Sequence, residues 1–334
     1  MTKIETIQTN LDFNPFKFKK GSLKAIDLFA GIGGIRLGFQ EAFGKNIEFV
    51  FSSEIDKYAK QTYYANFGEV PYGDITKIDE KDIPPHDIIL AGFPCQAFSV
   101  AGKRLGFEDT RGTLFFDVAR IATYHKPKLI FLENVKGFLN HDKGNTFKVV
   151  KQTLEDLGYK IYSKVLNAKD FGVPQNRERI YIVAFLDNVD FDFPNNLNKN
   201  VSIHDMFETK IDDKYYYNNK PLFEKIKDDV ANKDSIYQWR RKYVRENKSG
   251  VCPTLTANMG TGGHNVPIIK DNKGIRKLTP KECLNFQGFP RNFKFPNLAD
   301  GQLYKQAGNS VVVEVIKEIA KSINCSFLKV QNVF

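Results

Sequence analysis

The sequence predicts an α/β fold with a doubly wound, mostly parallel sheet and a second, smaller domain. Three short apolar runs have the length of buried parallel strands; they span residues 24–29, 49–54 and 87–90. Each run leads into residues suited to a binding or reactive site, as expected at the carboxyl edge of such a sheet. From about Phe191 the sequence becomes polar and tyrosine-rich. We therefore expect one domain of residues 1–190 plus 305–334, interrupted by a smaller domain at residues 191–304.

The composition is that of a globular protein with a polyanionic partner. The 334 residues are 42% hydrophobic and 26% charged, which is ordinary for a water-soluble enzyme. No apolar run could span a membrane and the first residues lack a signal-peptide pattern, so we expect a cytoplasmic protein. The net charge of +10 and the pI of about 9.2 favour nucleic acid as a partner. Four cysteines without C-x-x-C spacing indicate neither a metal site nor a disulfide framework.

The first strand, residues 24–29, runs into a glycine turn at residues 30–34, and residues 35–43 follow at helical spacing. This order is typical of a nucleotide-binding unit, because glycines let a ligand approach the backbone and the helix start offers free N–H groups. The turn does not match G-x-G-x-x-G, which favours a smaller adenosyl ligand over a dinucleotide. The alternative is a turn with a purely structural role, because such turns have the same glycine-rich sequence.

Two carboxylates follow at the ends of the next segments. Glu54 closes the second strand, where an acidic residue can accept both hydroxyls of a ribose. The alternative is a glutamate that simply faces solvent. Asp74 closes a third short segment, where it could accept from an adenine amino group while Ile75 packs on the ring.

The stretch 91–99 brings Pro94 and Cys95 together at the end of a buried strand. A thiol on such a turn can be partly exposed, and nearby main-chain N–H groups favour its thiolate, so Cys95 is a candidate nucleophile. The alternative is a small, unreactive core residue. Residues 102–112 are rich in glycine and charge, and we expect a mobile loop that closes over a substrate.

A second reactive carboxylate, Glu133, is expected on the same sheet rim as Cys95, because it ends the buried strand at residues 128–132. On a further strand, Arg177 and Arg179 should project to one face. Two guanidiniums there suit a phosphate or carboxylate clamp, and a salt bridge with a local acid is the alternative. The remaining elements expected in this domain are helices at residues 113–122 and 146–157 and strands at 159–166 and 177–185.

In the smaller domain, residues 239–248 carry five basic residues, one acid and interleaved aromatics. Charged runs of this kind usually lie on a surface that only faces solvent. Beside the glycine-rich loop at residues 259–265, this one also suits contacts to the phosphates and base edges of nucleic acid. Further on, Thr279 is expected to cap a short helix that begins at Pro280. Residues 308–310 are expected to open an apolar C-terminal helix at residues 311–323, within the discontinuous larger domain.

Five motifs together resemble those of the cytosine-5 DNA methyltransferases, in particular the short bacterial enzymes of restriction–modification systems. They are Asp27-Leu28-Phe29-Ala30-Gly31-Ile32-Gly33-Gly34, Pro94-Cys95, Glu133-Asn134-Val135, Gln175-Asn176-Arg177-Glu178-Arg179 and Gly308-Asn309-Ser310-Val311. They occur in the order of the family, over roughly residues 24–185 and 276–323. The resemblance implies a Rossmann-like, S-adenosylmethionine-dependent methyltransferase fold. It also implies that residues from about 191 to 275 are the family's variable target-recognition region, with Thr254-Leu255 as its recurrent marker.

For the chemistry, the resemblance implies that Cys95 attacks C6 of a cytosine and so makes C5 nucleophilic. A protonated Glu133 would donate at N3 and Arg179 would contact O2, while Asn134 would position Glu133 and the base. Arg177 is expected to belong to the same catalytic group. The target cytosine would be flipped out of duplex DNA.

The resemblance also implies ligands and partners. S-adenosyl-L-methionine, converted to S-adenosyl-L-homocysteine, would be held by Phe29, Gly31, Gly34, Glu54, Ile55, Asp74, Ile75, Pro94, Asn309 and Val311. Contacts to double-stranded DNA are expected from Gln96, Ser99, Arg240, Arg241, Arg245 and Thr254. No metal and no membrane is expected, and we expect a monomer that works beside a cognate restriction endonuclease.

Two other functions fit part of the pattern. An RNA methyltransferase of the same superfamily would use the same pocket on a tRNA cytosine, but that branch carries a C-F-T motif that this chain lacks. A catalytically silent DNA-binding regulator would not be expected to keep Cys95, Glu133 and Arg179 together. The sequence therefore favours a DNA methyltransferase.

Overall fold

The computed structural model describes residues 21–94, 114–261 and 265–331. In these residues a six-stranded sheet has the order β2-β1-β3-β4-β7-β5. Its strands are β1 (Leu23–Leu28), β2 (Ile47–Ser53), β3 (Ile88–Ala91), β4 (Leu129–Val135), β5 (Lys160–Asn167) and β7 (Glu178–Phe185). The first four in spatial order are parallel, and β7 runs antiparallel to both neighbours. The predicted doubly wound, mostly parallel sheet is confirmed.

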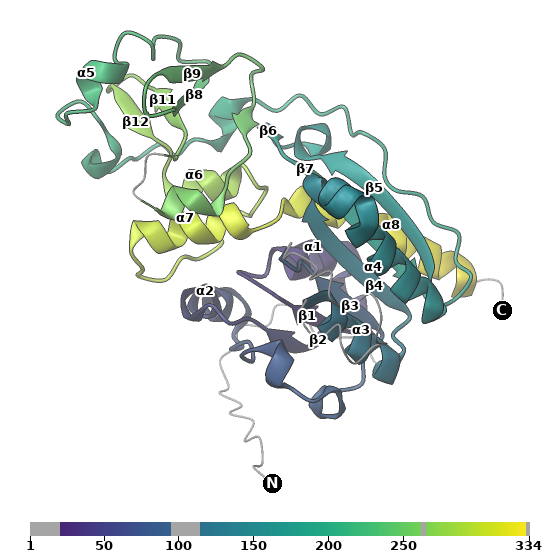
Figure 1. Ribbon diagram of the computed structural model, residues 1–334. Helices are drawn as coiled ribbons and strands as arrows, with labels where there is room; N and C mark the ends of the chain where they lie inside the picture. The colour runs from purple at the N-terminus through teal and green to yellow at the C-terminus, as the bar shows by residue number, and fades with distance from the viewer. Residues whose placement is uncertain (1–20, 95–113, 262–264, 332–334) are drawn as a thin grey trace.

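Helices cover both faces of this sheet (Figure 1). Helices α1 (Gly34–Phe43) and α8 (Val313–Gln331) pack on one face, and α3 (Leu114–His125) and α4 (Asn145–Asp156) on the other. The alternation of side chains along each strand produces the two cores: Phe131 contributes to the first and Ile130 to the second, both fully buried. The C-terminal helix thus packs on the six-stranded sheet.

A second, antiparallel sheet forms most of the smaller part (Figure 1). Within residues 114–261 and 265–331 its order is β12-β11-β8-β9. The strands are β8 (Ile236–Trp239), β9 (Val244–Asn247), β11 (Ile268–Lys270) and β12 (Ile275–Lys277), beside the short helix α5 (Phe223–Ile226). The sequence did not predict these strands, because three or four residues are too few to establish an apolar period.

Helices α6 and α7 and one strand pair lie between the two sheets, and α2 lies beside the large sheet (Figure 1). These elements are α2 (Lys57–Phe67), α6 (Pro280–Asn285), α7 (Asp300–Asn309) and the parallel pair β6 (Gln175–Asn176) and β10 (Cys252–Pro253). The 3-10 segments are η1 (Gly44–Asn46), η2 (Ile75–Lys77), η3 (Glu80–Asp82), η5 (Lys136–Gly144), η6 (Ala168–Phe171), η7 (Ile203–Met206), η8 (Asp213–Tyr215) and η9 (Ala257–Gly260).

One expected helix start is wrong. Gly308 and Asn309 end α7 instead of opening the C-terminal helix, which begins at Val313. Gly308 serves close packing: a Cβ at this position would lie 2.1 Å from the carbonyl carbon of Thr256. Helix α7 therefore rests directly on the main chain at the start of η9. The predicted domain boundary at residue 305 falls inside α7, and the division into domains stays a prediction.

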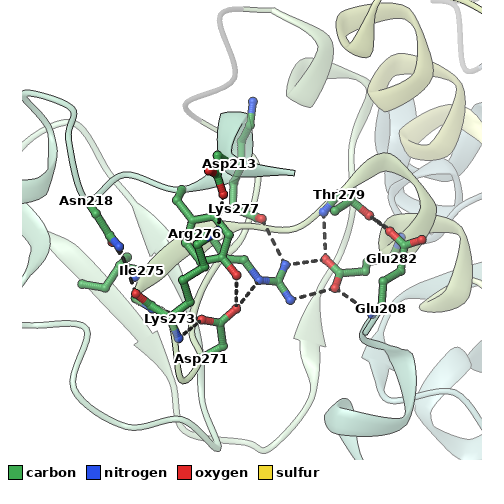
Figure 2. Close-up of polar contacts among 12 residues, drawn as sticks. Glu208, Asp213, Asn218, Asp271, Lys273, Ile275, Arg276, Lys277, Thr279 and Glu282 are labelled. Carbon is green, nitrogen blue, oxygen red and sulfur yellow. Dashed lines mark hydrogen bonds and ion pairs between the residues drawn. The ribbon is translucent and has the colours of Figure 1, made fainter. Parts of the chain in front are cut away.

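A buried ion-pair cluster fastens the small sheet to α6 (Figure 2). Arg276 on β12 is 2% exposed and bonds both oxygens of Glu282, at 2.7 and 2.8 Å. Its Nε bonds Asp271 at 2.7 Å. Thr279 caps α6 by accepting from the Glu282 N–H, and Glu282 accepts in return from the Thr279 N–H, which confirms the predicted cap. Because every charge in the cluster has a partner, the sheet and α6 are held in one orientation.

Candidate active site

A cavity of about 410 Å³ lies at the carboxyl edge of the parallel strands. This is the edge at which α/β sheets bind ligands. The cavity is lined by all ten residues predicted to hold the cofactor: Phe29, Gly31, Gly34, Glu54, Ile55, Asp74, Ile75, Pro94, Asn309 and Val311. Glu133, Asn134, Arg177 and Arg179 line it as well. One cavity therefore contains both predicted groups of residues, as far as the chain is described.

The Glu54 carboxylate is fixed by main-chain N–H groups. Gly31 donates to Oε2 and Asp56 donates to Oε1, both at 2.7 Å. The turn after β1 is tight, with left-handed φ values of 55° at Phe29 and 56° at Gly31. Such a backbone is uncommon for a side chain as large as phenylalanine and tends to occur at functional sites. The carboxylate is thus held at the cavity wall with lone pairs left for a ligand.

Two isoleucines at the cavity differ sharply in exposure. Ile75 is 2% exposed, whereas Ile55 is 73% exposed. Asp74 caps the turn at Ile75 by accepting from the N–H and hydroxyl of Thr76, and the hydroxyl bond in particular lowers the pKa of Asp74. An exposed apolar side chain at a cavity wall suits contact with the flat face of a ligand ring.

Glu133 and Arg179 form an ion pair inside the cavity. Glu133 Oε1 lies 3.1 Å from Arg179 Nε, and both side chains are nearly buried. Burial raises the pKa of Glu133 above its ordinary value, although Arg179 and Arg177 pull it down. Oε1 itself accepts no hydrogen bond of good geometry within the described residues. A carboxyl group in this setting favours holding a proton and can donate it to a base.

Asn134 connects the end of β4 to the segment that precedes Cys95. Its Nδ2 donates to the carbonyl of Phe93 at 2.9 Å, and its Oδ1 accepts from the N–H of Val135 at 2.8 Å. Cys95 itself, like Gln96, Ser99 and the predicted loop at 102–112, lies outside the described residues. Asn134 therefore fixes the main chain two residues before the predicted nucleophile.

Arg177 has a different role from Arg179. It is 3% exposed, and its guanidinium donates to the carbonyls of Leu255 at 2.7 Å and Ser310 at 2.6 Å. Burial, together with the charge of Arg179, lowers the pKa of Arg177 to about 9. The two guanidiniums do not form a single clamp: Arg179 pairs with a local acid, which was the alternative interpretation, and Arg177 joins three separate segments of main chain.

Helix α7 contributes residues that sequence reasoning missed. Lys305 and Gln306 line the cavity. Lys305 Nζ pairs with Asp56 at 2.7 Å, and Gln306 accepts from the Thr62 hydroxyl at 2.7 Å. About 250 residues of chain separate each pair, so no local motif could have revealed them. These contacts hold α7 against α2 at the cavity wall.

The predicted DNA-contacting residues are only partly brought together. Arg240, Arg245 and Thr254 line a second, smaller cavity next to the β8–β9 hairpin. Arg241 does not line it and has a left-handed φ of 66° in the turn of that hairpin. In the described part of the chain, no cluster of histidine, cysteine, aspartate or glutamate is arranged to hold a metal ion. None of the described helices is long and apolar enough to cross a membrane.

Comparisons with known proteins agree on one family. The model of the C-5 cytosine-specific DNA methylases matches residues 23–325. The chain is 53% identical over 317 residues to the type II methyltransferase M.Bsp6I of Bacillus sp. (strain RFL6), covering 92% of this chain and 100% of that protein. It is 44% identical over 325 residues to M.HhaI of Haemophilus parahaemolyticus, covering 91% and 95%. A Spodoptera frugiperda DNMT2 mutant structure superimposes with a TM-score of 0.71 at 24% identity, covering 91% and 100%, which supports the fold.

Proposed function

Because the chain belongs to the C-5 cytosine-specific DNA methylases and is a DNA cytosine-5-methyltransferase, we propose that it methylates one cytosine in a short duplex site. The cytosine is rotated out of the helix and forms a covalent bond with Cys95. A role in a type II restriction–modification system is supported by relatives that are named type II methyltransferases. We further propose that it acts as a monomer on DNA that a cognate endonuclease would otherwise cut.

S-adenosylmethionine is the proposed methyl donor, and the larger cavity fits it. Glu54 offers a fixed carboxylate to the ribose hydroxyls, and Ile55 offers an exposed apolar face to the adenine. At Gly34 a Cβ would lie 2.8 Å from Val311 and 2.9 Å from Ser310, so the cavity wall has no room for a larger residue at this position. Bound there, the cofactor supplies an electrophilic methyl group.

The observation that carries the proposal is the Glu133–Arg179 pair, which lies in the same cavity as Pro94, the residue before the predicted nucleophile. As the Cys95 thiolate forms its bond to C6 of the cytosine, negative charge develops at N3 and O2. Glu133, whose pKa is raised by burial, donates its proton at N3. Arg179 stabilises the charge at O2. Once C5 carries the methyl group that the cofactor would supply, loss of the C5 proton to solvent, return of the N3 proton to Glu133 and breakage of the Sγ–C6 bond restore the aromatic ring and the thiolate.

The other cysteines support this assignment by contrast. Cys252 and Cys283 are fully buried, and burial raises the pKa of each thiol well above its ordinary value. Cys325 is exposed on α8 and does not line the cavity. None of these three thiols is set up as a nucleophile in the cavity.

The test is Cys95→Ser with labelled S-adenosylmethionine, offered either duplex DNA or tRNA. Wild type should label DNA, and Cys95→Ser should lose methyl transfer by orders of magnitude while cofactor binding by calorimetry persists. Cys325→Ser is the matched control and should keep its activity. Retention of more than about a tenth of the wild-type rate in Cys95→Ser would contradict covalent catalysis. Labelling of tRNA alone would favour the RNA branch of the superfamily.

A further inference from the structure

The second cavity, of about 220 Å³, lies where the β8–β9 hairpin meets the β6–β10 pair. Three polar residues of its lining come from the hairpin: Gln238 from β8, Arg240 from the turn and Arg245 from β9. Asn176 and Thr254 line the opposite side. Gln238 and Arg245 are directly paired in the β8–β9 register. Side chains of such a pair share one face of the hairpin.

The charges in this cavity lack partners. Both arginines are exposed, and within the described residues neither guanidinium makes an ion pair or hydrogen bond. Gln238 has the opposite shortage: its Oε1 is shielded from solvent and accepts no hydrogen bond. A buried acceptor without a donor costs free energy until a ligand supplies one. The cavity thus presents two sets of donors beside one unmet acceptor.

We propose that this cavity reads a guanine–cytosine pair through the major groove, next to the target cytosine; the inference rests on the proposed function. The major-groove edge of this pair offers two acceptors, N7 and O6 of guanine, and one donor, N4 of cytosine. Arginine donors match the first two, and the Gln238 oxygen matches the third after a rotation of its carboxamide. A phosphate would use the arginines but would leave Oε1 without a donor.

The position of the pair follows from the wall that the two cavities share. Asn176 lines the second cavity, and Arg177, the next residue, lines the first. On the facing segment Thr254 donates to the carbonyl of Asn176 at 2.7 Å, and the carbonyl of Leu255 accepts from Arg177 at 2.7 Å. Adjacent residues thus face the two cavities, so the base pair that is read lies beside the cytosine that enters the first.

The experiment uses the full-length enzyme on a duplex library of random sequence, with bisulfite sequencing of the methylated pool. An invariant guanine–cytosine pair beside the methylated cytosine is expected. Replacing that guanine by 7-deazaguanine, which lacks the N7 acceptor, should lower wild-type methylation about tenfold or more. This readout needs no protein variant.

Three variants then assign the contacts. Arg240→Met and Arg245→Met should each lower the preference for that guanine about tenfold, and Gln238→Met should weaken rejection of other pairs. Arg241→Met, which removes the same charge outside the cavity, should weaken binding to all sequences alike and lower the salt slope by about one.

The outcomes separate the two proposals. Methylation without an invariant neighbouring guanine–cytosine pair would overturn the inference alone, as would unchanged preference in all three cavity variants. No methyl transfer to any library member would overturn the proposed function and the inference with it.

Discussion

Replacing Gly308 with alanine should separate α7 from η9 and open the cofactor cavity. An added Cβ would lie 2.1 Å from the carbonyl carbon of Thr256, 2.2 Å from its oxygen and 2.3 Å from the nitrogen of Ala257. Ordinary contacts between carbons are about 3.5 Å, so the two segments must move apart by more than about 1 Å. All three atoms belong to the main chain, which cannot turn aside as a flexible side chain would.

The expected loss of stability follows from three contributions. Overpacking costs about 3 kcal/mol when the surroundings cannot yield. The movement also weakens the bonds from Arg177 to Leu255 and Ser310, and hydrogen bonds to a charged group contribute about 1.5–3 kcal/mol. Alanine in a helix returns about 1 kcal/mol. The net loss in the free energy of unfolding should be about 3–5 kcal/mol.

Chemical denaturation measures this loss, and calorimetry should also detect weaker binding of S-adenosylmethionine, because Gly308 lines the cavity. Gly137→Ala is the matched control: nothing lies within 4 Å of its added Cβ and its φ is not left-handed. It should change stability by less than about 0.5 kcal/mol. If Gly308→Ala were equally silent, the account of close main-chain packing would be wrong.

Three further predictions concern charged groups. Glu54→Ala should weaken the free energy of S-adenosylmethionine binding, measured by calorimetry, by about 1.5–3 kcal/mol. The affinity for DNA without cofactor should stay unchanged, and an unaltered Kd for the cofactor would place Glu54 outside the site. Since the raised pKa of Glu133 means that the folded state binds the proton more tightly, wild-type stability should fall as pH rises from the ordinary carboxyl range through that raised pKa. Glu133→Gln should lack this fall in pH-dependent denaturation, and parallel curves would refute it. Arg276→Met should cost about 3–5 kcal/mol by leaving Glu282 buried and unpaired, whereas the double variant with Glu282→Leu should recover much of that loss in the same assay; no recovery would contradict the charge argument.

The large sheet and its rim were predictable because their signals are local. Strand β3 and the first part of β4 are continuous apolar runs, Glu54 directly follows β2 and Glu133 lies near the end of β4, so parallel topology alone brings Glu54 and Glu133 to one edge. The small sheet was not predictable, because its strands are only three or four residues long and β11 pairs with β8, about 30 residues away in the sequence. Lys305 was missed for a related reason: its partner, Asp56, is distant in sequence.

The anchors that Arg177 uses have a consequence for how this enzyme can diversify. All three of its acceptors are main-chain carbonyls, which every amino acid possesses. Substitution of the side chains near Leu255 should therefore leave the attachment between the proposed reading segment and the proposed cofactor site unchanged. Gly308, in contrast, cannot be replaced by another residue without moving the main chain, because helix α7 lies too close to Thr256 at this position to leave room for a Cβ. We therefore expect related enzymes to change their target sequence through side-chain substitutions near Leu255, because the bonds from Arg177 to the main chain do not depend on those side chains.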